Sequence, residues 1–511
     1  MLHSEETLAE KFVKKWFWLY LFTIFIAPLG YITKVIISRD LSIEEVGMLY
    51  GVISFLLLLS SYNDLGCTES LNYFLPKNIV KWEYGKAKYL LWLTIKIQIL
   101  SSILIILMIF LLIPWLTAHY FKSDVWDLLT IGLLFFLGIN LVHIASTIFS
   151  VSQDTKLWKS VELVRLGSST IGTSILFFTD FWDTRTYMMS WILGLFLGCI
   201  FWWYYAYNKY YRTYFQGVSI EKDTSLRKSF YIYSFGTLLT ANISILLSQI
   251  DMQLIIYFLD QKSVWYYSTY LSLISLPFLI IGPIAWFLFP VISELSGRGD
   301  IQKIRMIVRE FSIYFMIIGI WTGLFLFEYG EYISVLLFWE KFRESWYILQ
   351  YSSLFIIFNF LIQISFQVMA GTWKIKERAH ILFITLLINI PLTIFLISTS
   401  LWVRWAALAV GISWIPLWYM SMRVIDEYRE PLDTKQLLVN LSTALLTAWS
   451  LFCIEKIFHI SWIWIFCIAI FAYLSIFLLV NKILLKKAFH TIQMVRKGKN
   501  TLPLHIPENI S

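Results

Sequence analysis

Charged residues are scarce in this chain of 511 residues, where they make up only 14% of the total. Soluble globular domains carry about a quarter of their residues as charges. Hydrophobic residues reach 59%, which excludes both a disordered chain and an ordinary soluble enzyme. The composition therefore indicates one polytopic membrane domain rather than several soluble domains.

Cysteine is also rare, and no phosphate-binding loop of the form GxxxxGK[ST] is present, so ATP-driven transport by this chain alone is not expected. The N-terminal segment MLHSEETLAEKFVKK leads into an apolar run without a small-residue cleavage site, so that run is expected to remain as a helix. No cysteine pair has the spacing of a metal or redox site, and no metal is predicted. All four cysteines lie inside apolar runs: Cys67, Cys199, Cys453 and Cys467.

Long apolar runs such as WIWIFCIAIFAYLSIFLLV fill most of the chain. A membrane helix needs about 20 such residues, whereas a transmembrane barrel shows segments of about 10 residues with alternating polarity. The fold class is therefore predicted to be all-α, with about fourteen transmembrane helices. Their expected spans are 16–37, 44–75, 88–113, 125–150, 157–179, 186–206, 229–258, 263–292, 306–327, 345–371, 379–398, 404–422, 436–454 and 461–485.

Lysine and arginine are distributed unevenly among the predicted loops. Most of the 41 basic residues fall in the two termini and in alternate loops between them, whereas the acidic residues divide more evenly. Because basic loops stay on the cytoplasmic side, we predict a multi-pass protein of the plasma (inner) membrane with both termini in the cytoplasm. The net charge of +8 then needs no nucleic-acid partner, and anionic membrane lipids are the expected contact.

The chain contains a weak internal repeat with an offset of about 217 residues. FSVSQDTKLWK (149–159) aligns with FQVMAGTWKIK (366–376), and LSIEEVGMLY (41–50) aligns with LDQKSVWYYS (259–268). The offset spans six helices, so the two copies are parallel, as in secondary transporters that bind substrate between two lobes. We therefore predict an N-lobe at 1–215, a C-lobe at 216–430, two further helices at 431–490 and a cytoplasmic tail at 491–511.

Residues 38–77 resemble the signature of helices 1 and 2 in polysaccharide and O-antigen flippases. These flippases belong to the multidrug/oligosaccharidyl-lipid/polysaccharide exporter superfamily. The resembling elements are Arg-Asp-Leu-Ser from Arg39, Glu-Val-Gly from Glu45, Asp-Leu-Gly from Asp64 and Phe-Leu-Pro ending at Pro76.

A second segment, 248–268, resembles the matching stretch of helices 7 and 8, with Asp251 in the usual acidic place. One departure stands out further along the chain. Trp339 occupies the position before Glu-Lys at which this family usually has glycine, which puts the conformation of that loop in question.

The resemblance implies two lobes that form a V around a central cavity. It also implies a flippase that moves a polyprenyl-(pyro)phosphate-linked oligosaccharide from the cytoplasmic to the outer leaflet by alternating access. Such repeat units build O-antigen, capsule or exopolysaccharide. No cofactor is expected, Na+ or H+ is the expected coupling ion, and a polysaccharide polymerase is an expected partner.

Basic residues at membrane depth are costly and therefore point to function. A diphosphate and a polar glycan need charge-assisted donors. We predict that two basic layers of the cavity bind the substrate, formed by Lys34 and Arg39 at one end and by Lys96 and Arg165 nearer the cytoplasm. An alternative for Lys34 is that its amine snorkels to the membrane surface.

Acidic residues within the predicted spans are assigned to gating or ion coupling: Asp64, Glu69, Glu162 and Asp251. Asp64 is a predicted partner of Arg165 or Lys96. Asp251 is predicted either to pair with Lys34 or Arg39 across the lobes or to bind a proton or sodium ion. For Glu162, simple neutralisation of Arg165 three residues away is the competing interpretation.

Three other functions remain as alternatives. A lipid II flippase and a drug or cation antiporter belong to the same superfamily, although the antiporters usually have twelve helices. An integral-membrane glycan polymerase or ligase would be an enzyme with catalytic residues on a large outer loop. The longest predicted outer loop is 328–344, without a nucleophile–base pair, so the chain is not expected to be an enzyme.

Overall fold

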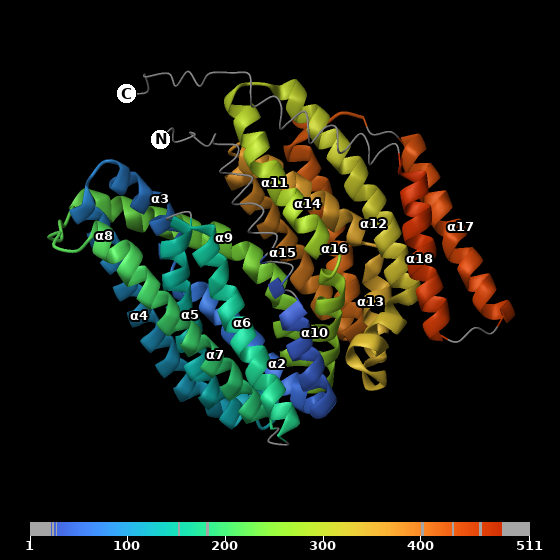
Figure 1. Ribbon diagram of the computed structural model, residues 1–511, viewed down its shortest axis with the longest axis horizontal. Coiled ribbons are helices and arrows are strands. Elements are labelled where there is room, and N and C mark those ends of the chain that lie inside the picture. Colours follow the sequence, from blue (N-terminus) through green and yellow to red (C-terminus); the bar gives the residue numbers. More distant parts are fainter. Residues whose placement is uncertain are drawn as a thin grey trace, which may run out of the picture.

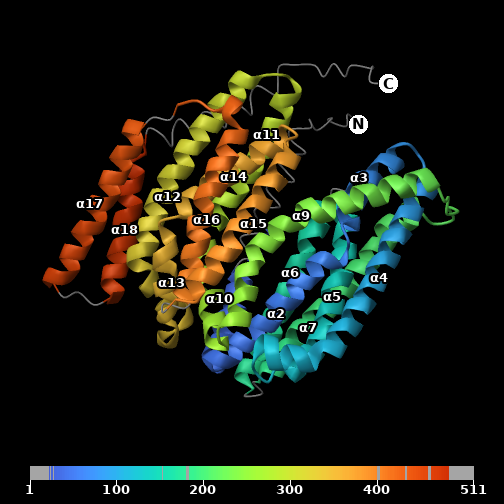
Figure 2. The same ribbon diagram turned by 180° about the vertical axis from the view of Figure 1, so that it is seen from behind.

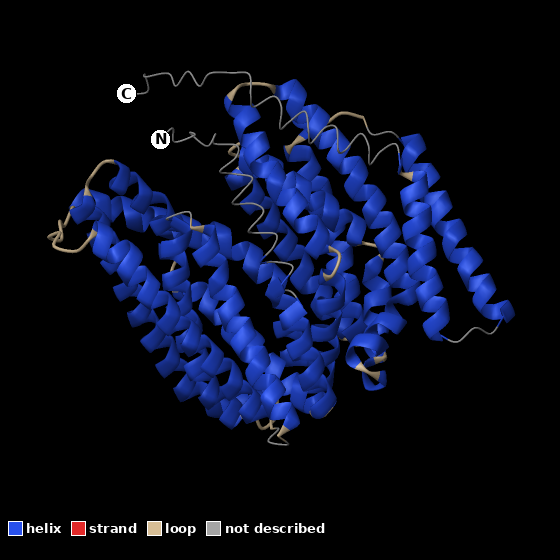
Figure 3. Cartoon of the chain, in the orientation of Figure 1, coloured by secondary structure: helices blue, strands red, loops and turns tan. Residues whose placement is uncertain are grey.

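The computed structural model describes residues 28–151, 154–179, 183–399, 403–431, 434–458 and 462–482, together with 22, 25 and 26. These residues form helices and no strand, as Figure 3 shows. Each predicted span corresponds either to one helix or to two helices separated by a short break. The predictions for the cytoplasmic tail and for the start of the first span lie outside the described residues.

A first bundle is formed by the N-terminal part of the chain. It begins with a helix over 28–40. The helices that follow are α2 (Ile43–Asn63), α3 (Cys67–Val80), α4 (Tyr84–Trp115), the π-helix η1 (Leu116–Phe121), α5 (Trp126–Val151), α6 (Thr155–Phe178), α7 (Thr184–Tyr205), the π-helix η2 (Ala206–Tyr211) and the single turn α8 (Arg212–Tyr214).

A second bundle follows the long helix α9 (Thr224–Phe258). It contains α10 (Gln261–Ser275), α11 (Phe278–Gly297), α12 (Ile301–Phe338), η3 (Glu340–Phe342), α13 (Glu344–Ser353), α14 (Ile356–Gly371), α15 (Ile375–Ile397), α16 (Val403–Val424) and η4 (Asp426–Tyr428). Two further helices, α17 (Thr434–Phe458) and α18 (Trp462–Val480), end the described chain.

The described helices are those of a multi-pass membrane protein. Ten of them are long and apolar enough to cross a membrane, and α13 with α14 adds an eleventh if this pair, bent by 58°, is one span. Large apolar side chains such as Leu111, Phe178 and Phe471 are exposed on the outside of the bundles. In lipid such exposure carries no hydrophobic penalty.

The span predicted at 44–75 is broken between α2 and α3, and the Asp-Leu-Gly motif makes the break. Leu65 and Gly66 both have positive φ angles, 50° and 75°. The carboxylate of Asp64 accepts hydrogen bonds from the backbone N–H groups of Gly66 and Thr68, at 3.0 and 3.1 Å. A Cβ atom on Gly66 would come within 2.2 Å of the Ser234 carbonyl oxygen on α9. Glycine at this position therefore serves both the turn and the close approach of α9.

The two bundles meet at one end of the molecule, which we call the converging end, where α2 and α10 begin (bottom in Figure 1). They separate toward the opposite, diverging end. At the converging end α2 packs directly on α10, since a Cβ atom on Gly47 would lie 1.9 Å from the Gln261 carbonyl oxygen. The Gly47 of the Glu-Val-Gly motif thus permits this close contact between the bundles.

Helix α9 connects the bundles and crosses the molecule diagonally, as seen from behind in Figure 2. It contacts α2 and α3 on one side and α15 on the other. The lobe boundary predicted at residue 215 therefore stays a prediction, because α9 packs on helices of both bundles.

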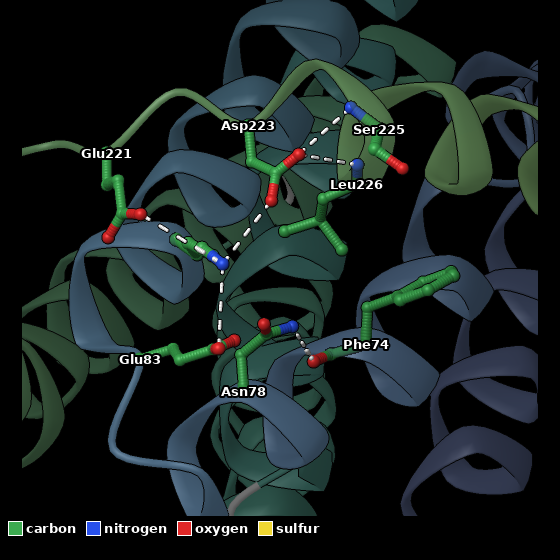
Figure 4. A network of polar contacts seen from close by, with 8 residues as sticks. Phe74, Asn78, Glu83, Glu221, Asp223, Ser225 and Leu226 are labelled. Carbon is green, nitrogen blue, oxygen red and sulfur yellow. Dashed lines mark hydrogen bonds and ion pairs between the residues drawn. The ribbon is translucent and has the colours of Figure 1, made fainter.

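The start of α9 is fixed to the first bundle by a polar network (Figure 4). The amine of Lys86 lies 3.3 Å from Asp223 and 3.5 Å from Glu83. Asp223 also caps α9 by accepting the N–H groups of Ser225 and Leu226. The segment between the bundles is thus held at the diverging end of α4.

Helices α17 and α18 attach to the second bundle through α12. The side-chain oxygen of Asn440 accepts hydrogen bonds from the Trp321 indole at 3.1 Å and from Asn481 at 2.9 Å. Trp321 also belongs to a hydrophobic cluster shared by these three helices. Buried polar contacts of this kind fix one packing arrangement.

Candidate functional site

A cavity of about 310 Å³ lies between the first bundle and helices α9 and α10. Its walls combine hydroxyl, amide and aromatic groups with aliphatic side chains, and Arg165 is the one charged residue among those that the structure places in the lining. The polar and aromatic lining residues are Thr33, Tyr50, Ser54, Phe135, Arg165, Ser169, Trp191, Gln249 and Ser268.

Arg165 projects from α6, which packs tightly on α7 at Gly194. Among the described residues Arg165 forms no ion pair. Glu162 influences its charge from one turn away, but the carboxylate of Glu162 pairs instead with Lys159 at 3.0 Å. His143 on α5 is exposed and lies within electrostatic range of Arg165. The guanidinium therefore lies at the cavity wall without an ion-pair partner in the described part of the chain.

Lys34 lies beside this cavity rather than in its lining, and it is only 6% exposed. Its amine donates to the carbonyl and hydroxyl oxygens of Ser268 at 2.7 and 2.9 Å, and to the Ser272 hydroxyl at 2.7 Å. The rings of Tyr50 and Trp265 lie 4.9 and 4.6 Å from it. Lys34 thus joins the first helix to α10, and neutral groups hold its amine, with cation–π attraction contributing.

Arg39 and Lys96 lie away from the cavity. Arg39 is exposed at the converging end, and its guanidinium lies over the Trp339 ring at 5.1 Å. Lys96 is exposed on the face of α4 that also exposes Trp92 and Leu100, because the opposite face of α4 packs on α3 and α5. The predicted grouping of Lys96 with Arg165 in one basic layer is not found in this structure.

The acidic residues of α2 and α3 have different surroundings. Both carboxylate oxygens of Asp64 cap the start of α3, so in this conformation they do not bind Arg165 or Lys96. Glu69 is exposed in the first turn of α3. Their roles in gating stay predictions.

Asp251 is buried on α9, with 3% of its surface exposed. It accepts a hydrogen bond of 2.8 Å from the Thr393 hydroxyl on α15, and Asn389 is a second partner of the carboxylate. Neither Lys34 nor Arg39 forms an ion pair with it in the described structure. The reason is geometric: Asp251 is about 200° around the helix from the cavity-lining Gln249, so it faces α15 and not the first bundle.

Several cavity residues were not predicted from the sequence. Four of them are neutral, so they lack the high cost of a buried charge that draws attention to a residue in the sequence: Tyr50, Trp191, Gln249 and Ser268. The internal repeat did contain one usable signal. Its paired segments 41–50 and 259–268 start α2 and α10, the helices that meet at the cavity.

The fold and the cavity define a class of protein, a multi-pass helical membrane protein with a cavity between two helical bundles. The structure is similar to that of the lipid II flippase MurJ in an inward closed conformation, with a TM-score of 0.74, 15% sequence identity, and coverage of 92% of this chain and 99% of that chain. It is also similar to a multidrug resistance MATE family transporter of the MOP superfamily in an inward-facing conformation. There the TM-score is 0.64 at 13% identity, with coverage of 80% and 98%.

The sequence identifies the family more narrowly. The family model described as polysaccharide biosynthesis protein matches residues 12–296, more than half of the chain, and the chain belongs to this family. An uncharacterized membrane protein of Methanocaldococcus jannaschii is 22% identical over 456 residues, which cover 84% of this chain and 88% of that protein. The chain is thus a member of the polysaccharide biosynthesis protein family, and its fold is similar to that of MurJ and of a MATE family transporter.

Proposed function

We propose that this protein flips a polyprenyl-(pyro)phosphate-linked oligosaccharide, a repeat unit of O-antigen, capsule or exopolysaccharide, from the cytoplasmic to the outer leaflet of the plasma membrane. The observation that carries the proposal is Arg165. It is a cation without an ion-pair partner among the described residues, at the wall of a cavity between two bundles of a polysaccharide-family protein.

The chemistry of the cavity suits such a substrate. A guanidinium binds phosphate oxygens in a bidentate manner, and the imidazole of His143 lies within electrostatic range of it. Ser54, Ser169 and Gln249 offer hydrogen bonds to sugar hydroxyls, and the lipid tail stays in the bilayer. Family membership supports a glycan lipid over a drug as the substrate.

The arrangement of the bundles supports alternating access. If both termini lie in the cytoplasm, as the basic loops predict, the converging end is the outer end and the diverging end faces the cytoplasm. The substrate would then enter from the cytoplasmic side in this state. A polysaccharide polymerase that receives the product is a proposed partner.

The coupling ion would bind at Asp251. A carboxylate, the Thr393 hydroxyl and the Asn389 amide present hard oxygen ligands, which suit Na+, and the same carboxylate can bind a proton. The side-chain oxygen of Asn389 is buried, and no described residue donates a hydrogen bond to it. No group of three or more His, Cys, Asp or Glu side chains suited to a metal occurs among the described residues.

The proposal is tested by binding of a fluorescent polyprenyl-diphosphate oligosaccharide to the purified protein in detergent. Arg165→Ala should weaken binding at least tenfold, because the diphosphate loses a charge-assisted pair worth about 1.5–3 kcal/mol. Arg165→Lys should recover part of the affinity. Lys96→Ala is the matched control, since this lysine lies on the exposed apolar face of α4, and its affinity should stay within twofold of the wild type.

Equal binding by Arg165→Ala and the wild type would contradict the proposal. A lipid II flippase is the second candidate, favoured by the structural similarity to MurJ over 92% of this chain. Competition by lipid II at lower concentrations than by other polyprenyl-linked glycans would select this candidate. Competition by organic cations alone would instead indicate an antiporter.

A further inference from the structure

The segment between α12 and α13 reaches across the converging end and touches the first bundle. The amine of Lys341 donates to the carbonyl oxygen of Leu41 at 2.8 Å and lies 3.5 Å from that of Arg39. Two residues earlier, the Trp339 ring lies under the Arg39 guanidinium at 5.1 Å. Residues 339–341 of the second bundle therefore hold the turn between the first helix and α2 by two separate contacts.

The contact of Lys341 is a helix cap supplied by the other bundle. The carbonyl groups at the C-terminal end of a helix lack intrahelical partners, and a cation is favourable there. Arg39 and Leu41 lie at this end of the helix over 28–40. Asp40 between them accepts a hydrogen bond from the Tyr187 hydroxyl on α7, which fixes the turn to the first bundle. Lys341 thus binds a turn that is itself attached to α7 of the first bundle.

The backbone of Trp339 is strained. Its φ and ψ angles are 83° and 166°, a region that is essentially restricted to glycine. The conformation is held by hydrogen bonds on both sides, from the Trp339 N–H to the Val335 carbonyl and from the Phe342 N–H to the Trp339 carbonyl, at 2.9 and 3.0 Å. Trp339 is 57% exposed, so burial of its ring does not compensate the cost of the strained backbone. The favourable interaction that the structure shows for the ring is its contact with the Arg39 guanidinium.

We propose that residues 339–341 form a latch that keeps the two bundles together at the converging end. Lys341 and the Trp339 ring supply the holding contacts, and the strained backbone of Trp339 favours release. Both contacts cross between the bundles, so both must break whenever this end opens. The strain keeps the closed arrangement from becoming too stable to open within a transport cycle.

The test measures the separation of the bundles without any substrate, so its outcome does not depend on the proposed function. Spin labels are placed at Glu44→Cys and Lys262→Cys, two exposed positions at the starts of α2 and α10, after replacement of the four native cysteines. Distance distributions of the full chain in nanodiscs are recorded by double electron–electron resonance. Lys341→Gln and Arg39→Gln should each raise the long-distance population at least threefold.

Arg343→Gln is the matched control on the same segment. Its guanidinium pairs with Glu331 and Glu340, which belong to the second bundle, so its loss should leave the distribution unchanged. Lys341→Arg keeps a cationic donor and should behave as the wild type. If Lys341→Gln and Arg39→Gln give the wild-type distribution, or if Arg343→Gln opens the end as much as they do, the latch is wrong.

Substitutions of Trp339 separate the ring contact from the strain. Trp339→Phe keeps both and should stay close to the wild type. Trp339→Ala loses the ring but keeps a side chain at a positive φ, and it should give the largest open population. Trp339→Gly loses the ring and the strain together and should open less than Trp339→Ala. Equal open populations for the alanine and glycine variants would show that the strain does not favour release.

Discussion

At the scale of single residues, the buried charges of this protein are held by neutral partners. Lys34 is surrounded by serine oxygens and aromatic rings, and Asp251 by a hydroxyl and an amide. The cost of burying a charge in lipid identifies such residues in the sequence. It does not identify their partners, because serine, threonine and asparagine leave no comparable signal. The predicted pair of Lys34 with Asp251 is not formed among the described residues, because Asp251 faces α15 and not the first bundle.

Asp251 offers a test at this scale. Asp251→Asn keeps the size of the side chain but removes the charge that would bind Na+ or a proton. Transport into proteoliposomes should then no longer respond to a Na+ or proton gradient, whereas substrate affinity should change less than twofold. Glu69→Gln removes another predicted acidic residue, one that is exposed, and serves as the comparison. A gradient response that survives Asp251→Asn but not Glu69→Gln would indicate that the coupling ion binds at α3 and not at Asp251.

At the scale of helices, the boundaries follow from the apolar runs, but the breaks do not. The run over 44–75 is mostly apolar, and its pattern contains no information on the sign of φ at Leu65 and Gly66. For Asp64 of the Asp-Leu-Gly motif we predict a gating role, and that role stays a prediction. In the structure Asp64 is a helix cap. The same holds for Trp339, where the usual glycine of the family corresponds to a backbone conformation that glycine alone adopts without strain.

Gly66→Ala tests the break between α2 and α3. The new Cβ would lie 2.2 Å from the Ser234 carbonyl oxygen, at a φ of 75°. We expect a loss of at least about 1–3 kcal/mol of stability, measured as a lower midpoint of thermal unfolding in detergent. Gly167→Ala on α6 is the control, since its Cβ would meet nothing within 4 Å, and helix propensity should raise its midpoint slightly. Similar midpoints for the two variants would rule out the proposed role of Gly66.

At the scale of the whole molecule, the all-helical class and the order of the helices could be predicted, because both depend on long apolar runs. The face that each helix turns toward the inside of its bundle could not be predicted. Helix α4 is apolar on nearly all sides, so its sequence does not show that Lys96 faces outward with Trp92 and Leu100. Only the packing against α3 and α5 decides this, and that packing depends on contacts distant in the chain.

The central claim is that the cavity at Arg165 carries a glycan lipid across the membrane. The most direct measurement is the flipping of a fluorescent polyprenyl-diphosphate oligosaccharide in liposomes, detected by quenching from one side. The wild type and Lys96→Ala should equilibrate the lipid between leaflets, and Arg165→Ala should do so at least tenfold more slowly. Flipping by Arg165→Ala at the wild-type rate, or no flipping by the wild type in an intact, correctly inserted preparation, would contradict the account.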